Sequence, residues 1–162
     1  MRKIDFVPLI LSDVTDIFAI RVDNDRLTEF QKFLIMFKDT PDPYLKDDLF
    51  RIEAALEQIA QNGALESLFR PEGKMKDRVC AIPILIKPRG KGKGTLRLYC
   101  IRVSNQLLII GGGGLKTTQS YEQDPYLSRK VEELQLIDKE LQKAERFSKI
   151  EESIYNLSIE IE

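Results

Sequence analysis

The sequence contains no histidine and no tryptophan, and only two of its 162 residues are cysteine. Without histidine the chain cannot build a nucleophile–histidine triad or use imidazole as a general base, and most kinds of zinc site are excluded. The cysteines do not have the CxxC spacing, so we interpret Cys80 and Cys100 as buried thiols in a reducing compartment. We therefore expect neither a metal nor a cofactor.

Long hydrophobic runs are also lacking. No apolar stretch approaches the ~18 residues of a membrane-spanning helix. Asp5 and Asp13 interrupt the apolar N-terminal region, which does not have the pattern of a secretory signal. The sequence therefore indicates a cytoplasmic protein with no membrane segment. Because a length of 162 residues suits one domain, we expect residues 1–162 to fold as a single unit.

Charge is distributed unevenly along the chain, although the net charge is only -1. Residues 70–118 contain 11 basic and 2 acidic residues. Residues 1–69 contain 8 basic and 13 acidic residues, and residues 119–162 contain 6 basic and 11 acidic residues. A basic block between acidic flanks favours a face that binds a polyanion. The alternative is that these lysines protect exposed sheet edges from aggregation.

Hydrophobic periodicity predicts the order of the elements. The predicted elements are strands at 4–11 and 16–22, helices at 26–38 and 44–62, strands at 79–86, 96–103 and 106–110, and a helix beginning at Asp124-Pro125. Asn24 or Asp25 is expected to cap the first helix. Residues 147–161 fit the period of a helix and of a strand equally well.

This order predicts an α+β fold. N-terminal strands (1–25) and a helical hairpin (26–69) are expected to pack on an antiparallel β-meander. The basic meander occupies residues 77–116, and a C-terminal helical region (124–162) follows it.

A run of four glycines, Gly111 to Gly114, precedes Leu115-Lys-Thr-Thr118. It superficially resembles a phosphate-binding loop, but the Walker A pattern needs glycine directly before the lysine, where this chain has Leu115. One interpretation is a sharp turn at the end of the third meander strand. Another is that glycine lets a nucleic-acid backbone approach closely, with Lys116, Thr117 and Thr118 contacting phosphates.

The meander supplies the other candidate site residues. In Leu96 to Val103 the odd positions, which include Arg97 and Tyr99, share one face of the strand. Arginine can bind a phosphate through two hydrogen bonds, and tyrosine can stack on a base. Alternatively, each arginine packs its stem at a strand end and keeps its head in water. The basic residues expected to contact phosphate are Lys87, Arg89, Lys91 and Lys93 in a glycine-rich loop, and Arg102 in the strand.

With these residues in place, the chain resembles the RelE/ParE superfamily of bacterial toxins, and within it the HigB-type and phage-derived toxin-like proteins. The resemblance covers about residues 96–131. It rests on Arg97-Leu-Tyr99, on Leu115-Lys-Thr-Thr-Gln119 and on the helix start at Asp124. The chain departs from the family in having Thr117 after Lys116, where many members have a second lysine, and in lacking catalytic histidines.

The resemblance implies a toxin of a type II toxin–antitoxin system that cleaves mRNA on the ribosome. The ribose 2′-OH would attack the neighbouring phosphate, with Lys116 and Arg97 stabilising negative charge. Tyr99 or Tyr121 would stack or transfer the proton. The implied partners are the ribosome with its mRNA and a cognate antitoxin of the helix-turn-helix type.

Two other interpretations remain open from the sequence. The same surface can serve a non-catalytic role, binding nucleic acid or a protein target such as a topoisomerase. The basic hairpin can instead pair with the acidic helices of a second copy, which would give a homodimer weakened by salt.

Overall fold

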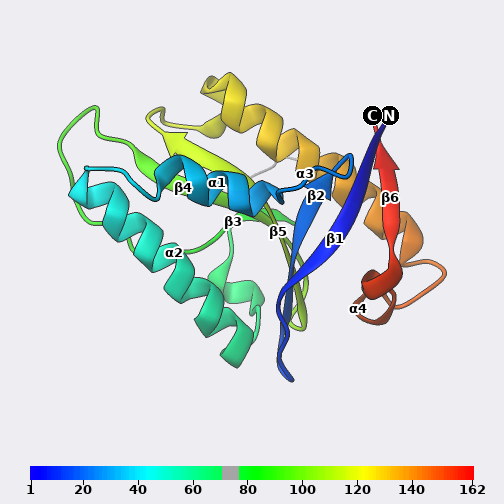
Figure 1. Ribbon diagram of the computed structural model, residues 1–162. Helices are drawn as coiled ribbons and strands as arrows, with labels where there is room; N and C mark the ends of the chain where they lie inside the picture. The colour runs from blue at the N-terminus through cyan, green and yellow to red at the C-terminus, as the bar shows by residue number, and fades with distance from the viewer. Residues whose placement is uncertain (71–76) are drawn as a thin grey trace.

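The structure, a computed structural model, describes residues 1–70 and 77–162. In this part of the chain six strands form one mixed sheet, and helices cover both of its faces (Figure 1). The strands are β1 (Arg2–Ile10), β2 (Asp16–Val22), β3 (Val79–Ala81), β4 (Thr95–Ser104), β5 (Leu107–Lys116) and β6 (Ser158–Ile161). The helices are α1 (Glu29–Phe37), α2 (Pro43–Asn62), α3 (Pro125–Ala144) and α4 (Ile150–Ser153).

The strands lie in the order β3-β4-β5-β2-β1-β6. Only β2 and β5 are parallel, and every other neighbouring pair is antiparallel. Helices α1 and α2 bury their apolar sides on one face of the sheet, while α3 and α4 cover the other face. The sheet therefore separates two hydrophobic cores, and each strand of its centre contributes side chains to both.

The predicted α+β fold is confirmed, with its N-terminal strands, helical hairpin, meander and C-terminal helix in the expected order. Several boundaries differ. The strand predicted at 79–86 ends at Ala81, and the strand predicted at 106–110 continues through the glycines to Lys116. The ambiguous C-terminal stretch contains both candidates, because α4 is followed by strand β6, which pairs with β1.

Local capping explains where the helices begin. Helix α1 starts later than predicted because Thr28, not Asn24 or Asp25, is its N-cap: the Thr28 hydroxyl accepts from the Gln31 N–H, and the Gln31 side chain accepts from the Thr28 N–H. Asn24 instead has a φ of 56° in the turn after β2. The predicted cap of α3 is confirmed, since the Asp124 carboxylate accepts from the Tyr126 and Leu127 N–H groups.

The glycine run forms a bulge inside β5 rather than a turn at its end. Leu98 on β4 pairs with Gly113, whereas Cys100 pairs with Ile110, so β5 has one more residue than β4 between these pairs. A β-carbon at Gly113 would collide with the backbone carbonyl of Arg97. The bulge shifts the alternation of side chains, so positions beyond it face the opposite side from the one that an unbroken strand would give.

The two helical layers meet beside this bulge. After Ile110, β5 no longer pairs with β2, and Lys130 of α3 packs at Gly112 together with Glu29 of α1. The Lys130 ammonium donates to the Glu29 carboxylate over 2.7 Å. Burial is the largest single influence and would lower the pKa of Lys130 and raise that of Glu29. The hydrogen bond and opposite charge of the pair, together with Lys32 beside Glu29 and Glu133 beside Lys130, outweigh burial, so the pKa of Lys130 is raised and that of Glu29 is lowered.

A substitution at Gly113 tests this close approach. We expect Gly113→Ala to lower the free energy of unfolding by at least about 2 kcal/mol, because the added methyl group must displace backbone atoms of β4. Urea denaturation followed by circular dichroism measures the change. The control is Gly90→Ala, where a β-carbon meets nothing within 4 Å. A Gly113→Ala protein as stable as the Gly90→Ala protein would contradict this packing.

Candidate nucleic-acid interface

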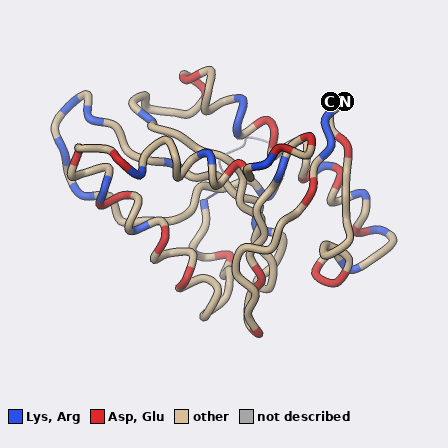
Figure 2. The backbone as a smooth tube through the Cα atoms, in the orientation of Figure 1, with Lys and Arg blue, Asp and Glu red and all other residues tan. Residues whose placement is uncertain are grey.

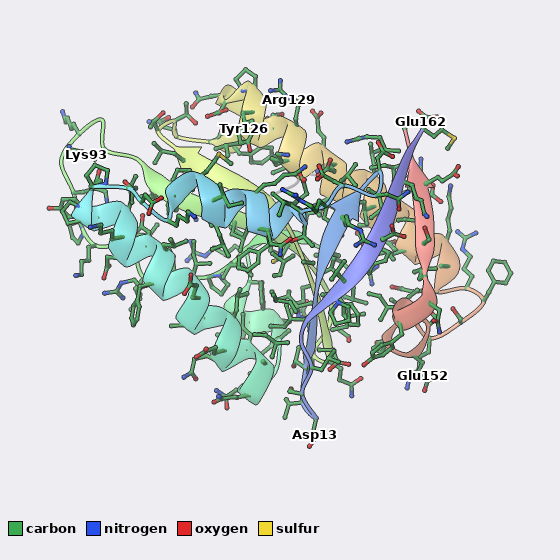
Figure 3. All side chains as sticks on the ribbon, viewed as in Figure 1. Asp13, Lys93, Tyr126, Arg129, Glu152 and Glu162 are labelled. Carbon is green, nitrogen blue, oxygen red and sulfur yellow. The ribbon has the colours of Figure 1, made fainter. Side chains whose placement is uncertain are left out.

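The end of the sheet where β4 begins and β5 ends carries a concentration of lysines. The loop 87–94 leads into β4, whose first residue, Thr95, pairs with Lys116 at the end of β5. Gly94 lies against the Thr117 side chain. Basic residues follow the loop in Figure 2, and Figure 3 labels Lys93 upon it. We call this end of the molecule the basic tip, defined by Lys87, Lys91, Lys93 and Lys116.

Arg89 lies in the same loop but points inward. Its guanidinium donates to both carboxylate oxygens of Asp48 on α2, each over 2.8 Å, and packs on the Tyr44 ring. Asp48 is fully buried and also accepts from the Leu96 N–H. The Arg89 side chain is only 5% exposed. Arg89 therefore fastens the loop to α2, and the outward cations of the loop are its lysines.

The exposed lysines of the loop have few internal partners. Lys87 lies 3.5 Å from the Asp47 carboxylate, which also accepts from Arg51. The hydrogen bond from Arg51 lowers the pKa of Asp47. In the described part of the chain, neither Lys91 nor Lys93 forms an ion pair, and both side chains are exposed to solvent. The basic tip therefore presents net positive charge to solvent.

Arg97 and Lys116 lie on the same face of the sheet, the one covered by α3. Tyr99 and Ile101, at alternate positions after Arg97, belong to the core beneath α3. The bulge turns Gly114 towards Tyr126 and Leu127 of α3, and Lys116 follows Gly114 on that face. Arg97 pairs with Gly114, so Lys116 is its diagonal neighbour, within reach of long side chains.

The Arg97 guanidinium is partly buried without a counter-charge. Its Nε atom is buried and has no hydrogen-bond partner, and no carboxylate in residues 1–70 or 77–162 forms an ion pair with it. The side chain lines a hollow of about 560 Å³ at the β3 edge of the sheet. Arg70 also lines this hollow, whose other walls are mostly apolar: Leu68, Ala81, Ile82, Pro83, Ile84 and Ile86.

The two tyrosines expected to act in catalysis lie beneath this face. Tyr99 is fully buried and Tyr121 is 9% exposed, with their ring centroids 6.3 Å apart. Tyr99 is two positions from Arg97 on the same face of β4, and Tyr121 packs against Tyr99, but both rings belong to the core. Neither ring can stack on a base while this core is closed.

The remaining predicted contacts separate into two groups. Arg102 lies near the other end of β4, roughly 20 Å along the strand from the basic tip. There it donates to the Ala64 carbonyl and the Asn105 side chain, which fixes the segment after α2. Thr117 lies at the basic tip, whereas the Thr118 hydroxyl donates to the Ser120 carbonyl and shapes the connection to α3.

An exposed aromatic residue that the sequence analysis did not select adjoins this face. Tyr126, in the first turn of α3, is 37% exposed and lies next to Gly114, with the Lys130 ammonium 5.4 Å from its ring centroid. Figure 3 labels it beside Arg129 on α3. The sequence feature that could have indicated Tyr126 is its position directly after Asp124-Pro125, where the helix begins. This position orients the side chain towards the glycine run.

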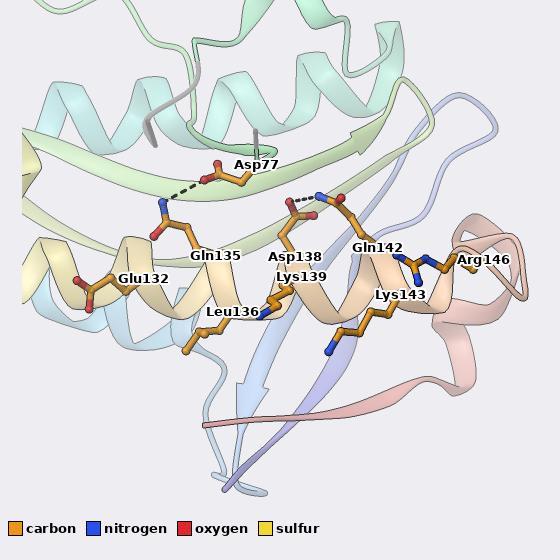
Figure 4. A pocket seen from close by; sticks show the side chains of 9 residues that line it. All are labelled: Asp77, Glu132, Gln135, Leu136, Asp138, Lys139, Gln142, Lys143 and Arg146. Atoms are coloured by element: carbon orange, nitrogen blue, oxygen red, sulfur yellow. Dashed lines mark hydrogen bonds between the residues drawn. The ribbon is translucent and has the colours of Figure 1, made fainter. Parts of the chain in front are cut away.

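A second hollow lies elsewhere, along the outer side of α3 (Figure 4). It has a volume of about 720 Å³. Its carboxylates are already engaged: Asp77 accepts from Gln135, and Asp138 accepts from Gln142 and from Arg78. Because these polar groups hold β3 and α3 together, we assign this hollow a structural role.

No group of three or more potential metal ligands occurs within residues 1–70 and 77–162. In the same residues no helix, including the 20-residue helices α2 and α3, is apolar enough to cross a membrane. Comparisons of the chain with protein-family models, with curated proteins and with solved structures found no match. We therefore infer the function from the geometry of the basic tip and of Arg97.

The buried Asp48–Arg89 pair should support the loop strongly. We expect Asp48→Asn to lower the free energy of unfolding by about 3–5 kcal/mol, because it leaves the Arg89 charge buried without a counter-charge. The matched control is the same change at the adjacent Asp47, whose pairs are more exposed and should contribute little to stability. Equal stability losses in the two variants, measured by urea denaturation, would contradict the anchoring role of Arg89.

Proposed function

We propose that this protein binds single-stranded RNA across the basic tip and the adjoining face that carries Arg97. The observation that carries the proposal is the partly buried Arg97 guanidinium, which has no carboxylate partner in the described residues. A buried charge without a partner is costly, and the arginines Arg78 and Arg89 of this protein both pair with carboxylates. A phosphate group would supply the missing counter-charge of Arg97.

The surroundings of Arg97 favour an extended polyanion over a small anion. Lys116 lies diagonally across from Arg97, and the lysines of loop 87–94 continue the positive charge beyond the end of the sheet. Tyr126 offers an exposed ring on the α3 side of the same region. Cations that follow a backbone, together with a ring for stacking, are typical of single-strand binding.

RNA binding is tested with a short fluorescent single-stranded RNA, by anisotropy at a series of salt concentrations. If about five phosphates are neutralised, log affinity should fall with log salt with a slope of about -3.5. Arg97→Gln should weaken binding about tenfold or more, because one charge-assisted phosphate contact is lost. The charge-matched control is Lys149→Gln, at the N-cap of α4 and away from the basic tip, and this variant should bind RNA like the parent protein. A slope near zero, or equal affinities for the two variants, would refute the proposal.

RNA cleavage by a RelE/ParE-like toxin is a second candidate function, favoured by one observation. The four residues expected to act in cleavage, Arg97, Tyr99, Lys116 and Tyr121, all lie on the α3 side of β4 and β5 or directly beyond it. Arg97 and Lys116 are suited to stabilising a phosphorane. Because both tyrosines are buried, proton transfer would need either an opening of this core or a group supplied by the ribosome.

Cleavage is tested by inducing the protein in a bacterial host while growth and mRNA 5′ ends are followed together. A toxin should arrest growth and produce new mRNA ends that require translation. Both effects should disappear in the Arg97→Ala, Lys116→Ala double variant, provided that circular dichroism shows it folded. Normal growth with intact mRNA, from soluble folded protein, would exclude cleavage in that host while leaving RNA binding to be decided by the anisotropy measurement.

A further inference from the structure

Cys80 and Cys100 lie directly opposite each other on neighbouring antiparallel strands. Cys80 is the middle residue of β3, and its partner in the register is Cys100 on β4. Both are present as thiols, 5% and 0% exposed, and both belong to the core beneath α1 and α2. The sequence predicts that both are buried thiols, but a spacing of twenty positions does not show that they lie opposite each other.

The hydrogen bonds around the pair define its geometry. The Ile82 N–H donates to the Leu98 carbonyl, and the Arg102 N–H donates to the Arg78 carbonyl. These bonds lie two positions to either side of Cys80 and Cys100, so the cysteines occupy a hydrogen-bonded site of the ladder. The Cα atoms at such a site are ~5.5 Å apart, which is within the range of disulfides.

The Cβ atoms set a narrower condition. Directly opposite residues have Cβ atoms ~4.5–5.5 Å apart, with the larger values at hydrogen-bonded sites, whereas disulfides need ~3.5–4.5 Å. A bond between these cysteines therefore requires the two strands to shift towards each other, and it stores strain. Strained disulfides are readily reduced, which is the property of a reversible bond rather than of a permanent structural one.

The position of β3 allows such a shift. It is a three-residue strand at the edge of the sheet, so its movement disturbs only the hydrogen bonds that pair it with β4. Cys80 is on this edge strand and is the more exposed of the two thiols, whereas Cys100 is on an interior strand. An oxidant should therefore reach Cys80 first, when the edge strand opens locally.

We propose that Cys80 and Cys100 are a reversible redox pair, joined by a disulfide under oxidising conditions. With a small disulfide such as oxidised glutathione, the Cys80 thiolate attacks one sulfur and releases one glutathione thiol. The Cys100 thiolate then attacks the Cys80 sulfur of the mixed disulfide and releases the second glutathione thiol. The two protein thiols lose two electrons to the glutathione disulfide, and their two protons pass to the released thiols through water.

A disulfide between Cys80 and Cys100 would fix the part of β3 that lines the Arg97 hollow. Ala81 and Ile82 follow Cys80 directly and line this hollow, and Arg97 lies on the same strand as Cys100, on its other face. The bond would hold β3 against β4 at the point where this wall begins. The inference does not depend on RNA binding, because its test measures covalent chemistry.

The native 162-residue chain is incubated with oxidised glutathione, and its remaining thiols are alkylated. The intact mass of the protein is then measured before and after reduction with dithiothreitol. We expect a monomer that is lighter by two hydrogens, takes up no alkylating agent and regains both thiols on reduction. Peptide mapping should join Cys80 to Cys100. In Cys100→Ala, Cys80 should stop at the mixed disulfide with glutathione, whereas in Cys80→Ala the buried Cys100 should remain a thiol.

Three outcomes would overturn the proposal. In the first, the wild-type chain keeps both thiols while circular dichroism shows that it is native. In the second, it forms only cross-linked dimers. In the third, it forms the internal disulfide only in denaturant, where the strand register no longer applies. Each outcome is read on the wild-type protein, so the result does not depend on whether the alanine variants fold.

Discussion

At Gly113 the backbone carbonyl of Arg97 occupies the space where the β-carbon of any other residue would lie. This close approach of β4 and β5 creates the bulge, and the bulge determines which side chains share a face beyond it. It turns Lys116 to the side of Arg97 and sends Leu115 to the core beneath α1 and α2. The neighbouring glycines let α3 approach β5 closely, at Leu134 and Leu127. Without the extra residue, the cations of the proposed interface would lie on opposite faces.

The buried charges of the protein are otherwise well matched. Arg78 pairs with Asp138, Arg89 with Asp48, and Lys130 with Glu29, so each of these cations has a nearby carboxylate. Such pairs are strongly destabilising to break, because one charge then remains buried alone. They place the loop 87–94, β3 and the two helical layers relative to one another.

Among the described residues, the charged side chains of Glu133 and Arg97 each have a buried polar atom without a hydrogen bond. The Glu133 carboxylate accepts from Arg2 through Oε2 over 2.7 Å, whereas its Oε1 atom is buried without a hydrogen bond; burial, with the nearby charge of Glu29, raises the pKa of Glu133. A carboxylate in that position can bind a proton and become neutral. The buried Nε atom of Arg97 has no hydrogen-bond partner, and no carboxylate in residues 1–70 or 77–162 forms an ion pair with this guanidinium.

Sequence reasoning identified what is encoded locally. Apolar periodicity located both long helices, and Asp124 followed by proline marked the start of α3. The alternation in β4 correctly placed Arg97 and Tyr99 on one face. It did not show that Tyr99 lies inside the core, because burial depends on α3, which comes later in the chain. The inward direction of Arg89 was hidden for the same reason, since its partner Asp48 is 41 positions away.

Register was the other quantity that local patterns did not contain. Four glycines indicate a backbone irregularity, but they do not say whether the strand ends or continues through a bulge. The pairing of Cys80 with Cys100 depends on how β3 aligns with β4 across a long connecting loop. Arg78 fastens the start of β3 to α3, and Arg89 fastens the loop that follows it to α2. The edge strand is therefore held on both sides of the point where the two cysteines meet and the wall of the Arg97 hollow begins.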